Sequence, residues 1–112
     1  MAEKRRDLPV PVKVVLTRPG GERTTEYAIN LSAGGACLQV RDPLSPGERV
    51  GLAFELPGEG GSARLEGTVV WCEKHQREHA RFCEMGVQFR AVDGAVSERL
   101  ARFAAQAVDS RR

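Results

Sequence analysis

Polar residues at short, regular spacing occur in the segment INLSAGGACL, which lies between two apolar runs. Asn30 is followed by Ser32 and then by the paired glycines Gly34 and Gly35. An amide and a hydroxyl offer both donors and acceptors, which suit the edge of a nucleobase or a phosphate group. Glycines allow positive φ angles and let backbone N–H groups approach a ligand closely. The same residues also suit a β-turn in which Asn30 and Ser32 bond to their own backbone, so the pattern alone leaves two interpretations open.

A second set of residues has ligand chemistry of a different kind. Cys72, His75, His79 and Cys83 follow the spacing C-x2-H-x3-H-x3-C, and two thiolates with two imidazoles suit tetrahedral zinc. The spacing is not one of the common zinc patterns, however, and Cys83 alternates in phase with the apolar residues that follow it. A free cysteine in that position packs as a small hydrophobic side chain. We therefore predict no metal site, with both histidines in a solvated charged loop, EKHQREHAR.

Nothing in the sequence is typical of catalysis. It contains no Ser-His-Asp order with supporting motifs, no P-loop and no carboxylate pair within the apolar runs. The single tryptophan, Trp71, is in phase with Leu65 and Val69, which predicts a position in the core and not one that stacks on a ligand. We expect a binding module, not an enzyme, and no cofactor.

Composition limits the partners and the compartment. A chain of 112 residues with 41% hydrophobic and 29% charged residues suits one domain around one core. The net charge of +2 implies no general attraction to nucleic acid, and no apolar run approaches the roughly 20 residues needed for membrane insertion. The N-terminal residues MAEKRRDLP do not resemble a secretory signal. Together with three cysteines, an odd number, this predicts reduced thiols and a cytoplasmic location.

Alternating apolar residues predict strands over most of the chain. Val10, Val12, Val14 and Leu16 fall on one face of the first run. Five more runs follow, separated by Gly- and Pro-rich turns: 23–29, 36–40, 50–56, 65–71 and 83–89. Six short strands at this spacing favour a closed or nearly closed antiparallel barrel, since closure removes exposed sheet edges.

The period changes to that of a helix near the C-terminus. Apolar residues recur at helical spacing from Val96 to Val108, and Asp93 is placed to cap the N-terminus. We expect this amphipathic helix to cover a barrel opening or a partner surface. The predicted organisation is a single domain, 1–112, with a flexible arm over 1–9, a barrel over 10–91 and a helix over 94–109.

Several segments together resemble the PilZ family. The spacing Asn30-x-Ser32-x-x-Gly35 is similar to that family's second signature. Other similar segments are Arg5-Arg6 before the first strand, DPLSPGERVGLAFELPG, GTVVW, MGVQF and the closing helix, so the resemblance runs from about residue 4 to residue 108. It implies a six-stranded antiparallel PilZ-type β-barrel with a C-terminal α-helix. It also implies a receptor for the bacterial second messenger cyclic di-GMP.

The resemblance also implies which residues bind the ligand. In the family the Asn and Ser of the loop contact guanine, and two arginines four residues apart clamp guanine and phosphate from the N-terminal arm. The ligand-binding residues expected here are Arg5, Arg6, Asn30, Ser32 and Gly35.

The sequence departs from the family pattern at one position. An Arg-x-x-x-Arg motif that begins at Arg5 ends at Pro9, and one that begins at Arg6 ends at Val10. A bidentate arginine contact to guanine contributes roughly 1–3 kcal/mol. Its loss corresponds to roughly 5- to 150-fold in affinity.

Two hypotheses follow, with a more remote third. The favoured one is a non-catalytic cyclic di-GMP receptor and adaptor, in which the nucleotide repositions the N-terminal arm and a protein partner reads the changed surface. The alternative is a PilZ-fold interaction module that has lost nucleotide binding because Pro9 replaces the second arginine. The third is a small zinc-binding regulatory protein.

Overall fold

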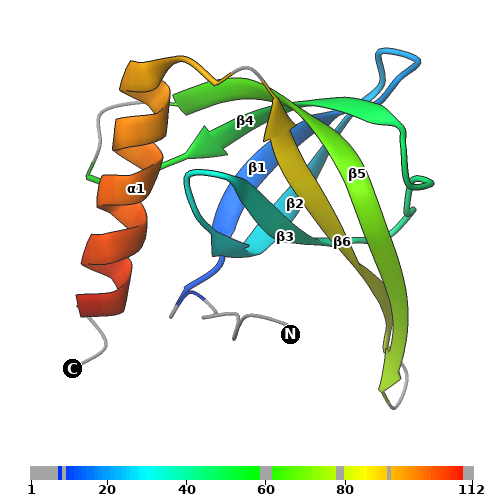
Figure 1. The fold of residues 1–112 in the computed structure, drawn as a ribbon. Coiled ribbons are helices and arrows are strands. Elements are labelled where there is room, and N and C mark those ends of the chain that lie inside the picture. The colour runs from blue at the N-terminus through cyan, green and yellow to red at the C-terminus, as the bar shows by residue number, and fades with distance from the viewer. Residues whose placement is uncertain (1–7, 9, 59–61, 78–79, 91, 110–112) are drawn as a thin grey trace.

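The computed structural model describes residues 8, 10–58, 62–77, 80–90 and 92–109. Its strands are β1 (Val12–Thr17), β2 (Arg23–Leu31), β3 (Gly35–Val40), β4 (Arg49–Glu55), β5 (Ser62–Arg77) and β6 (Ala80–Arg90). Neighbouring strands are antiparallel, and their order around a closed barrel is β1-β2-β3-β6-β5-β4, with β4 pairing back to β1 (Figure 1). The predicted six-stranded antiparallel barrel is therefore confirmed.

Alternation along the strands builds the core. Val12, Val14 and Leu16 of β1 are almost fully buried, and the rings of Phe54 and Phe89 meet edge to face inside the barrel at 5.8 Å. Val10 does not share this face as predicted, because β1 begins only at Val12 and the Val10 side chain is 72% exposed.

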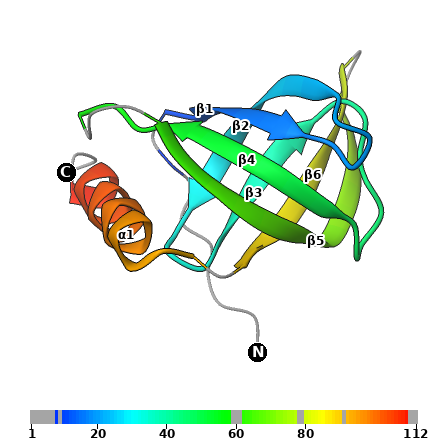
Figure 2. The same cartoon turned by 90° about the horizontal axis from the view of Figure 1, so that it is seen from above.

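The C-terminal helix closes one end of the barrel. α1 (Gly94–Asp109) begins where Asp93 Oδ1 accepts a hydrogen bond from the Ala95 N–H at 2.8 Å, which confirms the predicted cap. Leu100 and Phe103 belong to the same buried cluster as the barrel residues, and Figure 2 shows the helix lying across that end. Covering the opening is therefore the role of its apolar face. Among the described residues, no helix is long and apolar enough to cross a membrane.

A buried ion pair occupies the opposite end, where β1 turns into β2. Glu26 is 7% exposed on the inner face, and its Oε2 lies 3.3 Å from Arg18 Nη2. The same oxygen accepts a hydrogen bond from the Thr24 hydroxyl at 2.9 Å, and Arg18 Nη1 donates to the Asp42 carbonyl at 2.8 Å. These bonds compensate the two charges for their loss of water.

The β5–β6 hairpin extends beyond the barrel at this same end (Figure 1). The ladder continues to the pair Arg77–Ala80. The segment EKHQREHAR was predicted as a solvated loop, and this was wrong for its described part. His75 is a half-buried residue of β5, with its ring stacked on Phe82 at 5.3 Å between centroids.

Candidate functional site

The loop between β2 and β3 is held by the side chain of Ser32. Its Oγ accepts hydrogen bonds from the N–H groups of Gly34 and Gly35, both at 3.3 Å, and donates to the Gly35 carbonyl at 3.2 Å. The Ser32 N–H donates to the same carbonyl at 2.9 Å. For Ser32 the structure therefore has the self-satisfied turn, and the two glycine N–H groups point at Ser32 and not outward.

Gly35 is required for close packing. Its φ angle is not positive, unlike those of the turn glycines Gly21 and Gly58. A Cβ at Gly35 would lie 2.5 Å from the Val87 carbonyl oxygen of β6, so only glycine allows β3 and β6 to approach this closely. The positive φ that glycine allows is therefore not used at Gly35, and the role of this glycine is steric.

Two β-bulges decide which side chains face outward. In β2 the register shifts between Ala28 and Asn30, and in β5 it shifts between Val69 and Trp71. Each bulge inserts one unpaired residue and so reverses the face of everything after it. Val70, the extra residue in β5, is 44% exposed.

As a result, one row of cross-strand partners lies on the outward-facing side of four strands, and its two middle residues, Cys37 and Gly86, are themselves covered. Asn30 of β2 pairs with Cys37 of β3, Cys37 pairs with Gly86 of β6, and Gly86 pairs with Trp71 of β5. Directly paired residues share a face of the sheet. We call these four residues the outer row.

Trp71 was predicted in the core, and this was wrong. The bulge at Val70 takes it out of phase with Val69 and places it on the outer row. There it is half-buried, and a Cβ on Gly86 would overlap the indole at Nε1, Cε2 and Cδ1. Glycine at position 86 therefore makes room for the ring. The segments GTVVW and MGVQF flank one hairpin, and this signal in the sequence could have suggested that Trp71 pairs with Gly86. The alternation of apolar residues could not, because it places Trp71 on the inner face.

Asn30 is half-buried at the other end of the outer row. Among the described residues, its side-chain amide has no hydrogen-bond partner. Beside it, the Leu8 N–H donates to the Ile29 carbonyl at 2.7 Å, which fixes the chain at residue 8 next to the β2 bulge. Arg5 and Arg6, the remaining predicted ligand residues, lie outside the described residues.

A carboxylate borders the outer row. Glu84 Oε2 lies 3.5 Å from Cys37 Sγ, and Glu84 Oε1 lies 3.0 Å from His75 Nε2. Glu73 Oε2 is 4.0 Å from the same imidazole nitrogen. The outer row therefore has an aromatic ring at one end, an amide at the other and an acidic edge on the side of the extended hairpin.

The structure separates the residues of the considered zinc set. Cys72 pairs with Met85 and so shares the inner face with Cys83, whereas His75 pairs with Phe82 on the outer face. Burial, together with the neighbouring Cys83 thiol, raises the pKa of the Cys72 thiol above its usual value. The described residues contain no group of three or more potential metal ligands, and His79 lies outside them.

Comparisons with known proteins agree with this fold. The family model described as the PilZ domain matches residues 2–106. A search of curated proteins found no match.

Among solved structures, MrkH of K. pneumonia superposes with a TM-score of 0.85 at 14% identity, over 96% of this chain and 49% of MrkH. The PilZ domain of YcgR from Escherichia coli, a structure with c-di-GMP, has a TM-score of 0.81 at 15% identity over 97% of this chain and 92% of that one. The Bacillus subtilis inhibitor of motility MotI has a TM-score of 0.74 at 19% identity over 99% of this chain and 54% of its own. The chain thus spans about half the length of MrkH and MotI.

Proposed function

Since this chain belongs to the PilZ domain family, we propose that it is a non-catalytic receptor for cyclic di-GMP that acts on a protein partner. The observation that supports this best is the outer row, which joins Asn30 of the signature loop to Trp71 across the barrel surface. One of the structures with the same fold, that of YcgR, contains c-di-GMP.

The outer row has the chemistry that a two-base ligand needs. An indole provides a stacking surface for a base, worth about 1–3 kcal/mol. The amide of Asn30 offers one acceptor and two donors, which suit the donors and acceptors on a guanine edge. The two ends are three strand spacings apart along the sheet, about 14 Å, so separate parts of one ligand can reach both.

In our proposal the N-terminal arm supplies positive charge near the outer row. Leu8 is anchored beside Asn30, and Arg5 and Arg6 precede it by three and two residues. At up to about 3.4 Å per residue, these side chains can reach a ligand on the outer row. In this proposal ligand binding repositions the arm over the barrel, and a protein partner reads the changed surface.

Within this proposal Ser32 and Gly35 have indirect roles. Ser32 holds the loop through its three bonds, and Gly35 keeps β3 close to β6. They position Asn30, and Trp71 replaces Ser32 as the second direct contact.

The test is calorimetric titration of the protein with cyclic di-GMP. Asn30→Ala and Trp71→Ala should each weaken binding by about tenfold or more, and Trp71→Phe should retain much of the affinity because a ring remains. Lys13→Ala is the matched control, since Lys13 is an exposed residue of β1, away from the outer row. Equal binding by wild type, Asn30→Ala and Trp71→Ala would contradict the proposed site.

One observation favours the second candidate function, a PilZ-fold interaction module without nucleotide. Pro9 stands where the family motif has its second arginine. A wild-type protein that is folded and shows no heat of binding to cyclic di-GMP would support this alternative.

A further inference from the structure

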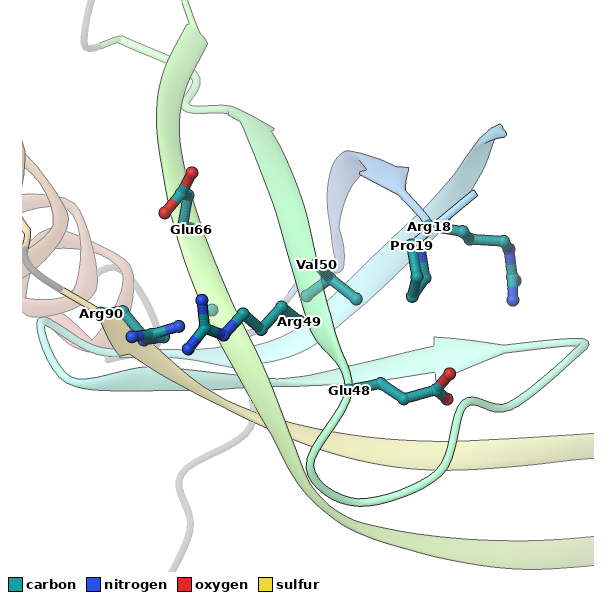
Figure 3. A pocket seen from close by; sticks show the side chains of 8 residues that line it. Arg18, Pro19, Glu48, Arg49, Val50, Glu66 and Arg90 are labelled. Atoms are coloured by element: carbon teal, nitrogen blue, oxygen red, sulfur yellow. The ribbon is translucent and has the colours of Figure 1, made fainter. Parts of the chain in front are cut away.

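Two arginines meet on the outer surface, outside the outer row. Arg49 of β4 pairs with Thr68 of β5, and Arg90 of β6 pairs with Glu66 of β5, so the arginines are diagonal neighbours on either side of β5. Figure 3 shows both side chains turned toward one another over that strand. They line an open hollow of about 440 Å³.

Neither arginine of this pair forms an ion pair with a described carboxylate, although Glu48 and Glu66 also line the hollow. Within the described part of the chain, no carboxylate lies within 4.0 Å of either guanidinium. Glu66 lies directly across from Arg90, yet its carboxylate points away from both arginines in Figure 3. Two like charges on one surface repel, and an anion bound between them reduces that repulsion. A guanidinium fork suits the oxygens of a phosphate in particular.

Arg90 of this pair also lies next to the loop between β2 and β3. The Phe89 N–H donates to the Gly34 carbonyl at 2.9 Å, so Arg90 follows a residue that is bonded to the loop. Gln88, two residues earlier on the same outer face, pairs with Gly35. Thr68 pairs with both Gln88 and Arg49, so one continuous row leads from Gly35 to Arg49.

We propose that Arg90, with Arg49, binds a phosphate of the nucleotide and so supplies the guanidinium charge that Pro9 removes from the arm. This inference rests on the proposed function and extends its site from the outer row to the ends of β4 and β6. An arginine at the end of β6, whose backbone belongs to the barrel, takes the place of one on the arm.

The experiment is titration with cyclic di-GMP at low and high salt. Arg90→Ala should weaken binding about tenfold at low salt, and Arg49→Ala/Arg90→Ala should weaken it further. Both variants should lose part of the salt dependence of the wild type, because the charge facing phosphate is gone. Arg64→Ala is the matched control, since it removes the same charge from another exposed position on β5.

A second variant tests the replacement itself. Pro9→Arg should restore most of the affinity that Arg90→Ala loses and should improve the wild type by a smaller factor, because the two arginines contact the same anion. Circular dichroism should show that every variant is folded, as both arginines are exposed.

The outcomes separate this inference from the proposed function. If wild type binds, Asn30→Ala weakens binding, and Arg90→Ala binds like wild type at every salt concentration, the phosphate contact is overturned and the receptor function stands. If the folded wild type does not bind cyclic di-GMP, both are overturned.

Discussion

The indole of Trp71 packs directly against Gly86 on the neighbouring strand. A Cβ at position 86 would overlap the ring, so the indole can keep this position only while residue 86 is glycine. This relationship places the only tryptophan of the chain on the outer surface. It also makes that surface observable, because the tryptophan fluorescence of the protein reports on a single ring.

Gly86→Ala should displace the indole from its place on β6. We expect a shift in tryptophan emission, loss of free energy of unfolding of about 1–3 kcal/mol, and weaker cyclic di-GMP binding. Gly34→Ala is the control, since a Cβ there meets no atom within 4 Å. An unchanged emission spectrum in Gly86→Ala would show that Trp71 does not lie against Gly86.

Ser32→Ala and Asn30→Ala should affect the protein differently. Ser32 makes three hydrogen bonds within its loop, so its removal should lower the free energy of unfolding by about 1 kcal/mol. Asn30→Ala should leave the stability nearly unchanged while weakening ligand binding. Urea unfolding of both variants checks this, and equal stability losses would contradict the division of roles.

Glu26→Ala should destabilise the barrel strongly, because it leaves the nearly buried Arg18 guanidinium with only the exposed Glu22 carboxylate and the Asp42 carbonyl as partners. Breaking such a pair costs about 3–5 kcal/mol, whereas Glu55→Ala, which breaks the exposed pair Lys13–Glu55, should cost less than about 1 kcal/mol. Replacing both partners, as Arg18→Met with Glu26→Leu, should recover much of the stability. Thermal unfolding of the wild type and these three variants measures the effect. If Glu26→Ala and Glu55→Ala have the same melting temperature, the Arg18–Glu26 pair is not important for stability.

Leu100→Ala should loosen α1 from the barrel. Leu100 is fully buried, so its truncation should lower the free energy of unfolding by about 2–5 kcal/mol. Glu98→Ala, an exposed position on the same helix, is the control. A Leu100→Ala protein as stable as Glu98→Ala would mean that the helix does not close the barrel in solution.

The Cys72 thiol should react slowly near neutral pH. Its pKa is raised by burial and by Cys83, so less thiolate is present than in a free thiol at the same pH. The midpoint of its alkylation rate against pH, followed by mass spectrometry, should lie above that of a small thiol, and Cys83→Ala should move it partway down. A midpoint below the small thiol would contradict the structure.

Local sequence determined most of the architecture. The alternation of Val12, Val14 and Leu16, the turn glycines and the helical period after Asp93 were sufficient, because each depends on neighbours within a few residues. The signature loop was also visible, since its residues are adjacent in the chain. Asn30 could therefore be predicted as a ligand residue without a structure.

Tertiary structure alone decided which residues join Asn30. The bulges at Ile29 and Val70 reverse the faces of the residues that follow, and nothing in strand periodicity marks them. A bulge exists because pairing with the next strand is more favourable with one residue left out, so it depends on partners far away in sequence. The register between strands, and not the pattern within any one strand, sets which side chains are neighbours. For that reason Trp71 faces outward, and Arg49 and Arg90 lie on either side of β5.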